Sequence, residues 1–330
     1  MSAGPGAGFS LVELMVSLTL GLAAMTAVGK VFQATSRSYA GNAQSSATQD
    51  NLRFGMAQIA RDIEMAGFFA DSEDPGRDIV IPPETRAAYP ASGCSQEWLF
   101  DDLASLDTIG NVRSADAAAK FPCLQGVRDE TDVLAIKRVL GRCERRPATN
   151  RFYLVETGTR AVFAFGNGGT APGLSCDNSL GTGQISYFQY VPTIWHIASD
   201  YGIPSLCREI LSGSRMIRNC VSQGIEDLQL EFGLDAAGDG SIQDGVADYF
   251  RSFDAPPDAL QRSRIVAVRV HLLGRSVERS PERAYIPSEH RYLLGNIRRQ
   301  PGPDGYYRKS MSALIPLRNP ARRISPVALP

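Results

Sequence analysis

The longest apolar pattern in the chain runs from Phe9 to Val28 and is followed by Lys30. The residues of this run that are not apolar are serine, threonine or glycine, except for one carboxylate, Glu13, at the fifth position of the run. At 1.5 Å per residue, a helix of these 20 residues would reach about 30 Å, the hydrocarbon thickness of a bilayer. The pattern therefore predicts a membrane-spanning helix that carries a single acidic side chain.

A second helical pattern follows, with apolar residues spaced by 4, 3, 4 and 3 positions. These residues are Leu52, Met56, Ile59, Ile63 and Ala66. The spacing predicts one buried helix face, with Asp50 as a possible N-cap and Gly67 just past the end. Residues 36–49 are rich in Ser, Gly, Ala and Thr, so we expect a kink or a looser helix there. We predict one long helix from Phe9 to about Ala66. The alternative is an anchor joined to an unrelated domain by a flexible linker.

From Phe68 onward, Pro, Gly, Asp and Ser punctuate short runs that have the length and alternation of strands. The candidate strands are Thr131–Val139, Arg151–Val155, Ala161–Phe165, Ile185–Trp195, Glu226–Leu234 and Arg264–Gly274. Residues 67–130 show no clear order of elements. A sheet built from these strands has an apolar face to cover, which the amphipathic helix half supplies. The sequence therefore predicts an α+β protein in which a long N-terminal helix packs on an antiparallel, β-rich domain.

The overall composition adds little to this prediction, but the distribution of charge along the chain is informative. The chain has 330 residues, 43% hydrophobic and 21% charged, which is ordinary for a globular protein, and its net charge is −1. Up to Gln261 it carries 20 basic and 31 acidic residues, and from Arg262 onward 14 basic and 4 acidic. The two parts are oppositely charged, so they could pair within the chain or with a neighbouring subunit.

Six cysteines lie beyond the apolar run, and none forms a C-x-x-C pair. They are Cys94, Cys123, Cys143, Cys176, Cys207 and Cys220. An even count at these spacings is typical of disulfides in an oxidising compartment rather than of a zinc site. Six cysteines allow 15 pairings, of which we expect the one in sequence order. The alternative is a set of buried free thiols.

Glu13 raises the question of how a carboxylate is tolerated in a lipid-facing helix, where it costs a few kcal/mol or more. Proximity to the headgroups is one answer. A second follows if the chain is cut between Gly8 and Phe9, because a new α-amino group would then lie about one helical turn from Glu13. An ordinary secretory signal fits less well, since residues 1–8 contain no Lys or Arg and no clear cleavage site follows Val28.

The stretch from Gly8 to Leu14, GFSLVEL, resembles the class III signal of type IV pilins and type II secretion pseudopilins. The resemblance implies that a prepilin peptidase cuts after Gly8 and that Phe9 becomes the N-methylated first residue. It also implies that Glu13 accepts the N-terminal ammonium group of a neighbouring subunit during filament assembly. This chain differs from most such leaders in having no basic residue before the cleavage point.

Further segments resemble the PilW family of type IV minor pilins and the related GspJ pseudopilins. They are RDIEMAGFF (residues 61–69), the region from Ser222 to Phe250, RIVAVRVHLLGRS (residues 264–276) and LIPLRNPARR (residues 314–323). The resemblance implies a non-enzymatic subunit that helps to initiate a pilus and stays at its tip. Its implied partners are other minor pilins, the major pilin, the prepilin peptidase and the inner-membrane assembly platform.

From this resemblance we expect a leader at residues 1–8 and a transmembrane helix half at 9–29. An amphipathic helix half would follow at 30–67, and a periplasmic pilin domain at 68–330. The protein would sit in the inner membrane and then move into the pilus. A type II secretion pseudopilin is the alternative within this class. A tip-exposed module that binds DNA or a surface is the alternative outside it, suggested by the arginines and tyrosines of the last 70 or so residues.

Other candidate chemistry is weak. Asp235 to Val246 contains only two of the four oxygen ligands that an EF-hand loop requires at positions 1, 3, 5 and 12, so we interpret it as an Asp/Gly-rich turn. Residues 166–171 follow a strand but lead into no helix, which favours a turn over a dinucleotide loop. The histidines are His196, His271 and His290, and none belongs to a metal or catalytic motif. We therefore expect no cofactor, no metal, no nucleic-acid partner and no enzymatic activity.

Overall fold

The computed structural model describes residues 8, 10–70, 72, 75–89, 93–101, 103–144, 147–157, 160–166, 185–235, 245–253, 257–280 and 290–319. The chain forms two compact units that meet between Ala47 and Thr48. Helix α1 (Leu11–Glu64) contributes its first part to one unit and its last part to the other.

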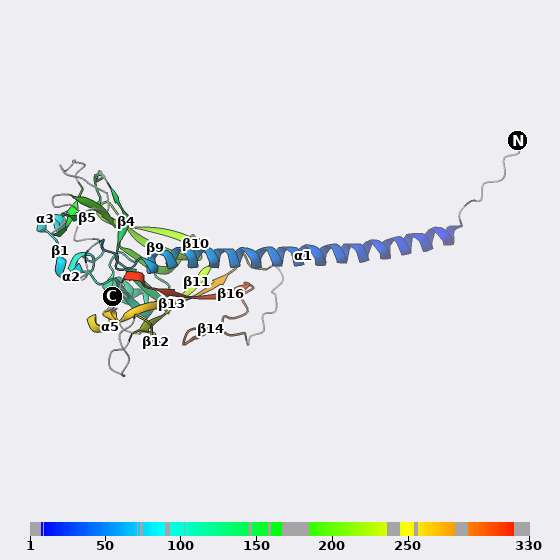
Figure 1. Ribbon diagram of the computed structural model, residues 1–330. Coiled ribbons are helices and arrows are strands. Elements are labelled where there is room, and N and C mark those ends of the chain that lie inside the picture. Colours follow the sequence, from blue (N-terminus) through cyan, green and yellow to red (C-terminus); the bar gives the residue numbers. More distant parts are fainter. Residues whose placement is uncertain are drawn as a thin grey trace, which may run out of the picture. The chain divides into compact units, whose positions relative to one another are not determined.

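Helix α1 is continuous over its whole length (Figure 1). Residues 36–49 belong to this helix without interruption, so the predicted loosening is not found there. No proline interrupts this stretch, and Ala, Gln and Ser all accept a helical backbone at modest cost. From Leu11 to Ala40 every side chain is exposed. This part has the length and apolar composition needed to cross a membrane.

The last part of α1 buries the face that its spacing predicts. Leu52, Ile59 and Ile63 are fully buried and Met56 is nearly so. The helix comes so close to the sheet that a Cβ on Gly274 would lie 2.9 Å from the Leu52 Cγ atom. Only glycine therefore fits at that position of the strand.

The strands form four sheets in the described part of the chain. Sheet A has the order β1-β6-β5-β7-β4 and contains β1 (Ile79–Val80), β4 (Val139–Glu144), β5 (Phe152–Glu156), β6 (Ala161–Phe165) and β7 (Ser186–Tyr190). Sheet B has the order β10-β9-β8-β3-β2 and contains β2 (Leu106–Val112), β3 (Thr131–Ile136), β8 (Thr193–Asp200), β9 (Ile203–Ser212) and β10 (Arg215–Gln223).

The other two sheets contain most of the C-terminal third. Sheet D has the order β12-β11-β13-β16 and contains β11 (Ile225–Leu234), β12 (Tyr249–Arg251), β13 (Ile265–Arg275) and β16 (Arg308–Pro316). A hairpin joins β14 (Tyr292–Leu294) and β15 (Ile297–Arg299). The described strand pairs are antiparallel except β1 with β6. Short helices are α2 (Pro75–Asp78), α3 (Pro83–Ala87), the π-helix η1 (Glu97–Asp101), α4 (Ser114–Lys120) and α5 (Ala259–Ser263).

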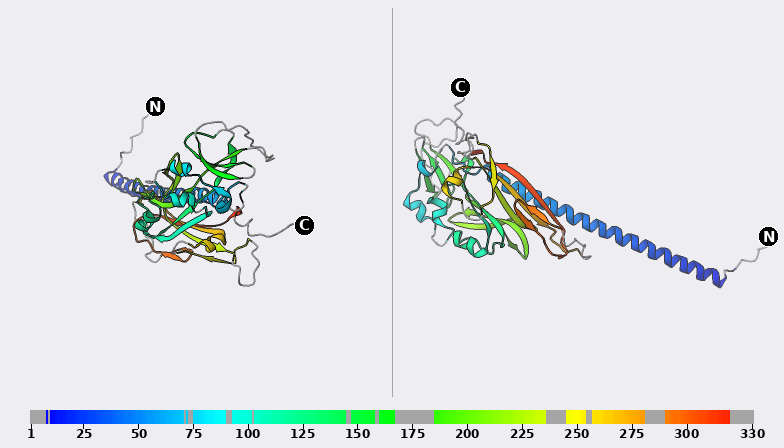
Figure 2. Two further views of the ribbon diagram at one scale, coloured as in Figure 1. Left: turned by 90° about the vertical axis from the view of Figure 1, so that its left-hand side faces the viewer. Right: turned by 90° about the horizontal axis from the view of Figure 1, so that it is seen from below.

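Sheet B separates two hydrophobic cores. Along β3, Val133 and Ala135 face an aromatic-rich core shared with sheet A, whereas Leu134 and Ile136 face the core that holds α1 and sheet D. Successive strand residues point to opposite faces, so a strand between two cores is apolar throughout. The left view of Figure 2 shows the green strands of sheet A and the yellow strands of sheet D on opposite sides of the domain.

The structure confirms the α+β fold class and places strands in all six candidate segments, but two segments cross from one sheet to another. The predicted strand Thr131–Val139 ends as β3 at Ile136, and Val139 is the first residue of β4 in sheet A. The predicted strand Ile185–Trp195 is two strands, β7 and β8, which belong to different sheets. The break falls at Val191 and Pro192, where proline has no N–H for a ladder and the Val191 N–H instead donates to the Arg138 carbonyl. The hairpin β9–β10 was not predicted, because polar side chains interrupt its alternation.

Candidate functional sites

Glu13 lies in the first turn of α1 and forms a reciprocal pair with Ser10. The Ser10 backbone N–H donates to Glu13 Oε2 at 3.0 Å, and the Glu13 backbone N–H donates to Ser10 Oγ at 3.2 Å. This is a capping box, in which each side chain satisfies a backbone N–H that the helix leaves free. The carboxylate therefore also stabilises the start of its own helix.

The surroundings of Glu13 favour a further, intermolecular partner. Its second oxygen, Oε1, has no partner among the described residues, and Glu13 is the only charged residue between Leu11 and Gly29. A carboxylate in an apolar helix is costly in lipid unless a cation meets it. Gly8, the predicted residue before the cleavage point, is exposed. Phe9 lies outside the described residues.

Asp62, near the end of α1, fixes the helix to the sheets. Arg138 Nη2 donates to Asp62 Oδ1 at 2.8 Å, and the Trp195 indole N–H donates to Asp62 Oδ2 at 3.0 Å. Arg208 approaches the same carboxylate at 4.0 Å and lies over the Trp195 ring. Asp62 is almost fully buried, so three segments of the domain converge on one helical side chain. This residue belongs to the RDIEMAGFF segment that resembles the PilW family.

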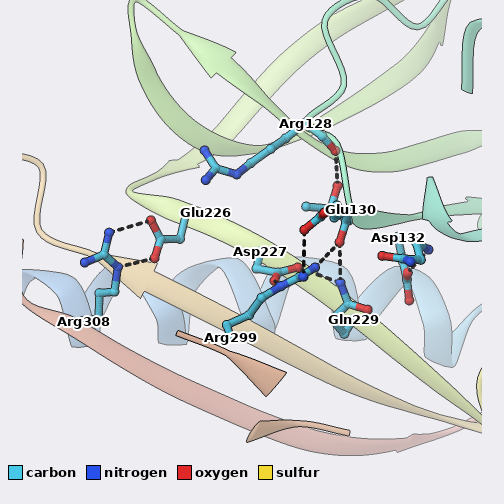
Figure 3. A network of polar contacts seen from close by, with 10 residues as sticks. Arg128, Glu130, Asp132, Glu226, Asp227, Gln229, Arg299 and Arg308 are labelled. Carbon is cyan, nitrogen blue, oxygen red and sulfur yellow. Dashed lines mark hydrogen bonds and ion pairs between the residues drawn. The ribbon is translucent and has the colours of Figure 1, made fainter. Parts of the chain in front are cut away.

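A second polar network joins β11 to the C-terminal strands (Figure 3). Arg299 Nε donates to Asp227 Oδ2 at 2.5 Å, and Arg299 Nη1 pairs with Glu130 at 3.0 Å. Arg308 pairs with Glu226 and with Asp304, the latter through Nη1 at 2.8 Å. Burial lowers the pKa of Arg308, but Asp304 and Glu226 outweigh it and hold that pKa above its usual range. The guanidinium group is therefore charged and fixed.

This network changes the interpretation of the basic C-terminal region. Arg299 and Arg308 bind acidic residues of the preceding part of the chain, and Arg318 pairs with Glu64 of α1 at 3.3 Å. Lys309 donates to Gln49 at 3.0 Å. Two tyrosines of this region are also engaged, since the Arg275 guanidinium lies 3.9 Å from the centre of the Tyr306 ring and the Tyr292 hydroxyl donates to the Arg308 carbonyl. Arg298 is exposed, and Arg322 and Arg323 lie outside the described residues.

His271 lies between Ser312 and Glu231 on the outer face of sheet D. Its Nδ1 atom is 2.7 Å from Ser312 Oγ, and its Nε2 atom is 3.1 Å from Glu231 Oε2. Arg269 also binds Glu231, at 3.0 Å. A serine, a histidine and a glutamate in this order are also the groups of a nucleophile, base and acid. However, Ser312 is exposed on an edge strand and lies directly opposite His271 in the strand register. Cross-strand pairing explains the contacts.

His196 lies in the interior of sheet B. Burial, followed by the nearby Arg218, lowers the pKa of His196 to about 3, so the ring is neutral. Arg218 Nε binds Glu209 Oε1 at 2.9 Å, which satisfies the inward-facing carboxylate of β9. In the described part of the chain, no cluster of three His, Cys, Asp or Glu side chains is placed to hold a metal ion.

The disulfides follow sequence order where the structure describes them. Cys94 is joined to Cys123, and Cys207 on β9 to Cys220 on β10. Cys143 is also disulfide-bonded. The sixth cysteine, Cys176, lies outside the described residues, so its predicted bond to Cys143 stays a prediction.

The remaining candidate motifs fall largely outside the described residues. Residues 236–244 of the Asp/Gly-rich segment and residues 167–171 of the glycine cluster are among them. At the ends of the Asp/Gly-rich segment, Asp235 is buried and its Oδ2 atom accepts the Gly245 N–H at 2.8 Å. This contact agrees with our interpretation of the segment as a turn.

Two features of these sites escaped the sequence analysis although the sequence carries their signals. Ser10 and Glu13 have the S-x-x-E spacing of a capping box, and an acidic residue such as Asp62 on a buried helix face requires a partner. The arginine that meets Asp62 lies 76 residues away. No local pattern points to it.

Together, the fold and the sites agree with what the resemblance to type IV pilins implies. An exposed, apolar N-terminal helix half with one acidic residue in its first turn continues into an amphipathic half that packs on antiparallel sheets.

Comparison with known protein families gives a match for the C-terminal part of the chain. Residues 194–319 match the family model described as PilW, Type IV Pilus-assembly protein W. The match confirms, over this range, the resemblance to type IV pilus minor pilins. A type IV-like pilin from Thermus thermophilus is similar in structure, with 14% sequence identity and a TM-score of 0.37, covering 83% of this chain and 97% of that one. No curated protein matches the chain.

Proposed function

We propose that this chain is a structural minor pilin that acts in the initiation and tip assembly of a type IV pilus. A prepilin peptidase would cut it after Gly8 and methylate Phe9, and α1 would hold it in the inner membrane with residues 68–330 in the periplasm. The main support is the lone carboxylate, Glu13, one turn from the proposed new N-terminus in an exposed apolar helix. The family match supports a role in pilus assembly.

In this proposal the two halves of α1 divide the work. The apolar half would pack among the helices of other minor pilins and the major pilin, and Glu13 would neutralise the N-terminal ammonium group of a neighbouring subunit. Asp62 and the buried residues around it would hold the domain on its helix while the assembly platform moves the subunit out of the membrane. The work consists of packing and charge pairing, and it requires no catalysis.

A deletion strain tests this role. We expect few pili on cells that lack the gene, with an unchanged ratio of subunits within the pili that remain, because an initiating subunit sets the number of filaments and not their composition. Counting filaments by electron microscopy after complementation is the measurement. Normal filament numbers together with loss of type II secretion would instead favour the pseudopilin alternative. The DNA-binding alternative gains no support from the described residues, because Arg299, Arg308, Lys309 and Arg318 are paired within the chain.

A further inference from the structure

Strand β11 has one edge that is only partly covered by another strand. It pairs with β13 along its length but with β12 only from Phe232 to Leu234. In the described part of the chain, backbone N–H groups before Phe232 on this edge therefore need partners other than a ladder. A buried N–H without an acceptor costs about 1–3 kcal/mol.

A single side chain from sheet B supplies the acceptor. Asp132 on β3 accepts the Leu230 N–H of β11 through Oδ2, at 2.7 Å. Its other oxygen accepts the Asn111 N–H, also at 2.7 Å. Asn111 has a φ of +47° and lies where the pairing of β2 with β3 shifts register, so its N–H is likewise outside the regular ladder. One carboxylate thus bridges sheets B and D.

The groups around Asp132 do not neutralise it directly. Among the described residues no cation lies within ion-pair distance of its carboxylate, although the residue is only 4% exposed. Asp227 on β11, whose charge further raises the pKa of Asp132, already binds Arg299 of β15 and the Gln229 side chain, and Arg299 lowers that pKa only from beyond ion-pair distance. Glu130, which precedes β3, also pairs with Arg299, and Arg128 points away from Asp132 (Figure 3). A buried carboxylate without its own counter-ion resists ionisation.

We propose that Asp132 is a proton-sensitive latch between sheets B and D, which holds the two sheets together more weakly when it is ionised. Burial, opposed by the N–H groups of Asn111 and Leu230, raises the pKa of Asp132 to about 7. Once the junction opens, the side chain is in water with an ordinary pKa of about 3.9. A group with a raised folded pKa stabilises the closed state while it is protonated. This contribution is lost as the pH rises through 7.

Ionisation of Asp132 would also affect how helix α1 packs on the two sheets. The core that buries Leu52, Ile59 and Ile63 of α1 is built from both sheets, and sheet B also binds Asn51 through Ser222. Looser contact between sheets B and D would therefore weaken the packing that holds this part of α1. The inference concerns residues from Asn51 onward and does not depend on the proposed function.

Hydrogen–deuterium exchange of the full chain in detergent tests the latch, with correction for the intrinsic effect of pH on exchange. Peptides that cover residues 106–112 and 225–231 should lose about tenfold in protection between pH 6 and pH 8, the change that linkage gives for pKa values of about 7 and 3.9. Asp132→Asn should abolish this dependence. Asp200→Asn is the matched control on sheet B, since the Asp200 side chain forms no hydrogen bond or ion pair in the described part of the chain, and it should retain the dependence.

Three outcomes would overturn the latch. The first is equal protection of these peptides at both pH values in the unmodified protein, and the second is a tenfold change that persists in Asp132→Asn. The third is an equal change in peptides of sheet A, such as residues 152–156, which would mean a general effect of pH. The comparison with sheet A uses the unmodified protein only, so it decides the question even if Asp132→Asn fails to fold.

Discussion

Glu13→Gln should leave the protein folded and membrane-bound but reduce its recovery in sheared filaments by about tenfold or more. Glutamine serves at this position of a capping box as glutamate does, so the helix start is preserved. The negative charge is lost. Removing one partner of an ion pair in a low-dielectric setting costs about 3–5 kcal/mol, and each 1.4 kcal/mol is about a factor of ten in an equilibrium. Immunoblotting of sheared filaments and of membranes measures both quantities.

Ser10→Ala is the matched control, because it removes the hydroxyl of the capping box and leaves the Glu13 charge in place. We expect its recovery in filaments to stay within about twofold, since loss of one cap costs about 1 kcal/mol and tertiary packing carries most of a helix. A Glu13→Gln protein recovered at the normal level would contradict the charge-neutralising role. So would a Ser10→Ala protein that fails as severely.

Asp62→Ala should lower the free energy of unfolding by about 3–5 kcal/mol, the cost of leaving a buried cation without its partner. Arg138, whose side chain is 15% exposed, would lose its carboxylate, and the buried Trp195 N–H would lose its acceptor. Urea denaturation of the full chain in detergent, followed by tryptophan fluorescence, measures the change. Trp195 contacts Asp62 directly, so its emission should also shift in the folded variant.

Glu64→Ala provides the control on the same helix turn. Its partner Arg318 is 65% exposed and 3.3 Å away, and an ion pair of this kind contributes about 0–1 kcal/mol. We expect this variant to unfold at nearly the normal urea concentration. Equal losses in the two variants, or a loss below about 1 kcal/mol for Asp62→Ala, would show that Asp62 does not fix the helix to the sheets.

Local patterns predicted the elements whose signals are continuous along the chain. Leu52, Met56, Ile59 and Ile63 define their helix face by spacing alone, and β3 is apolar throughout because both of its faces are buried. The same signals did not predict β9 and β10. There Glu209 points inward and is satisfied by Arg218 from the neighbouring strand, so a polar residue occupies a buried position.

The contacts that build the sites could not be predicted because they join distant parts of the chain. Asp227 meets Arg299, and Glu226 meets Arg308, across about 70 to 80 residues. The opposite charges of the two parts of the chain indicated that such pairing is possible, but not which residues meet. Asp132 is a further case, since its role depends on a β11 edge that only the order of strands in the sheets reveals.

The most direct test of the proposed function is the mass of the N-terminal peptide of the protein purified from membranes, together with its intact mass. We expect a chain that begins at N-methylated Phe9 and is lighter by six hydrogen atoms, one for each cysteine. A chain that still begins at Met1 or Ser2 would contradict processing by a prepilin peptidase. Glu13 would then have no neighbouring ammonium group to neutralise, and the filament role would fail with it.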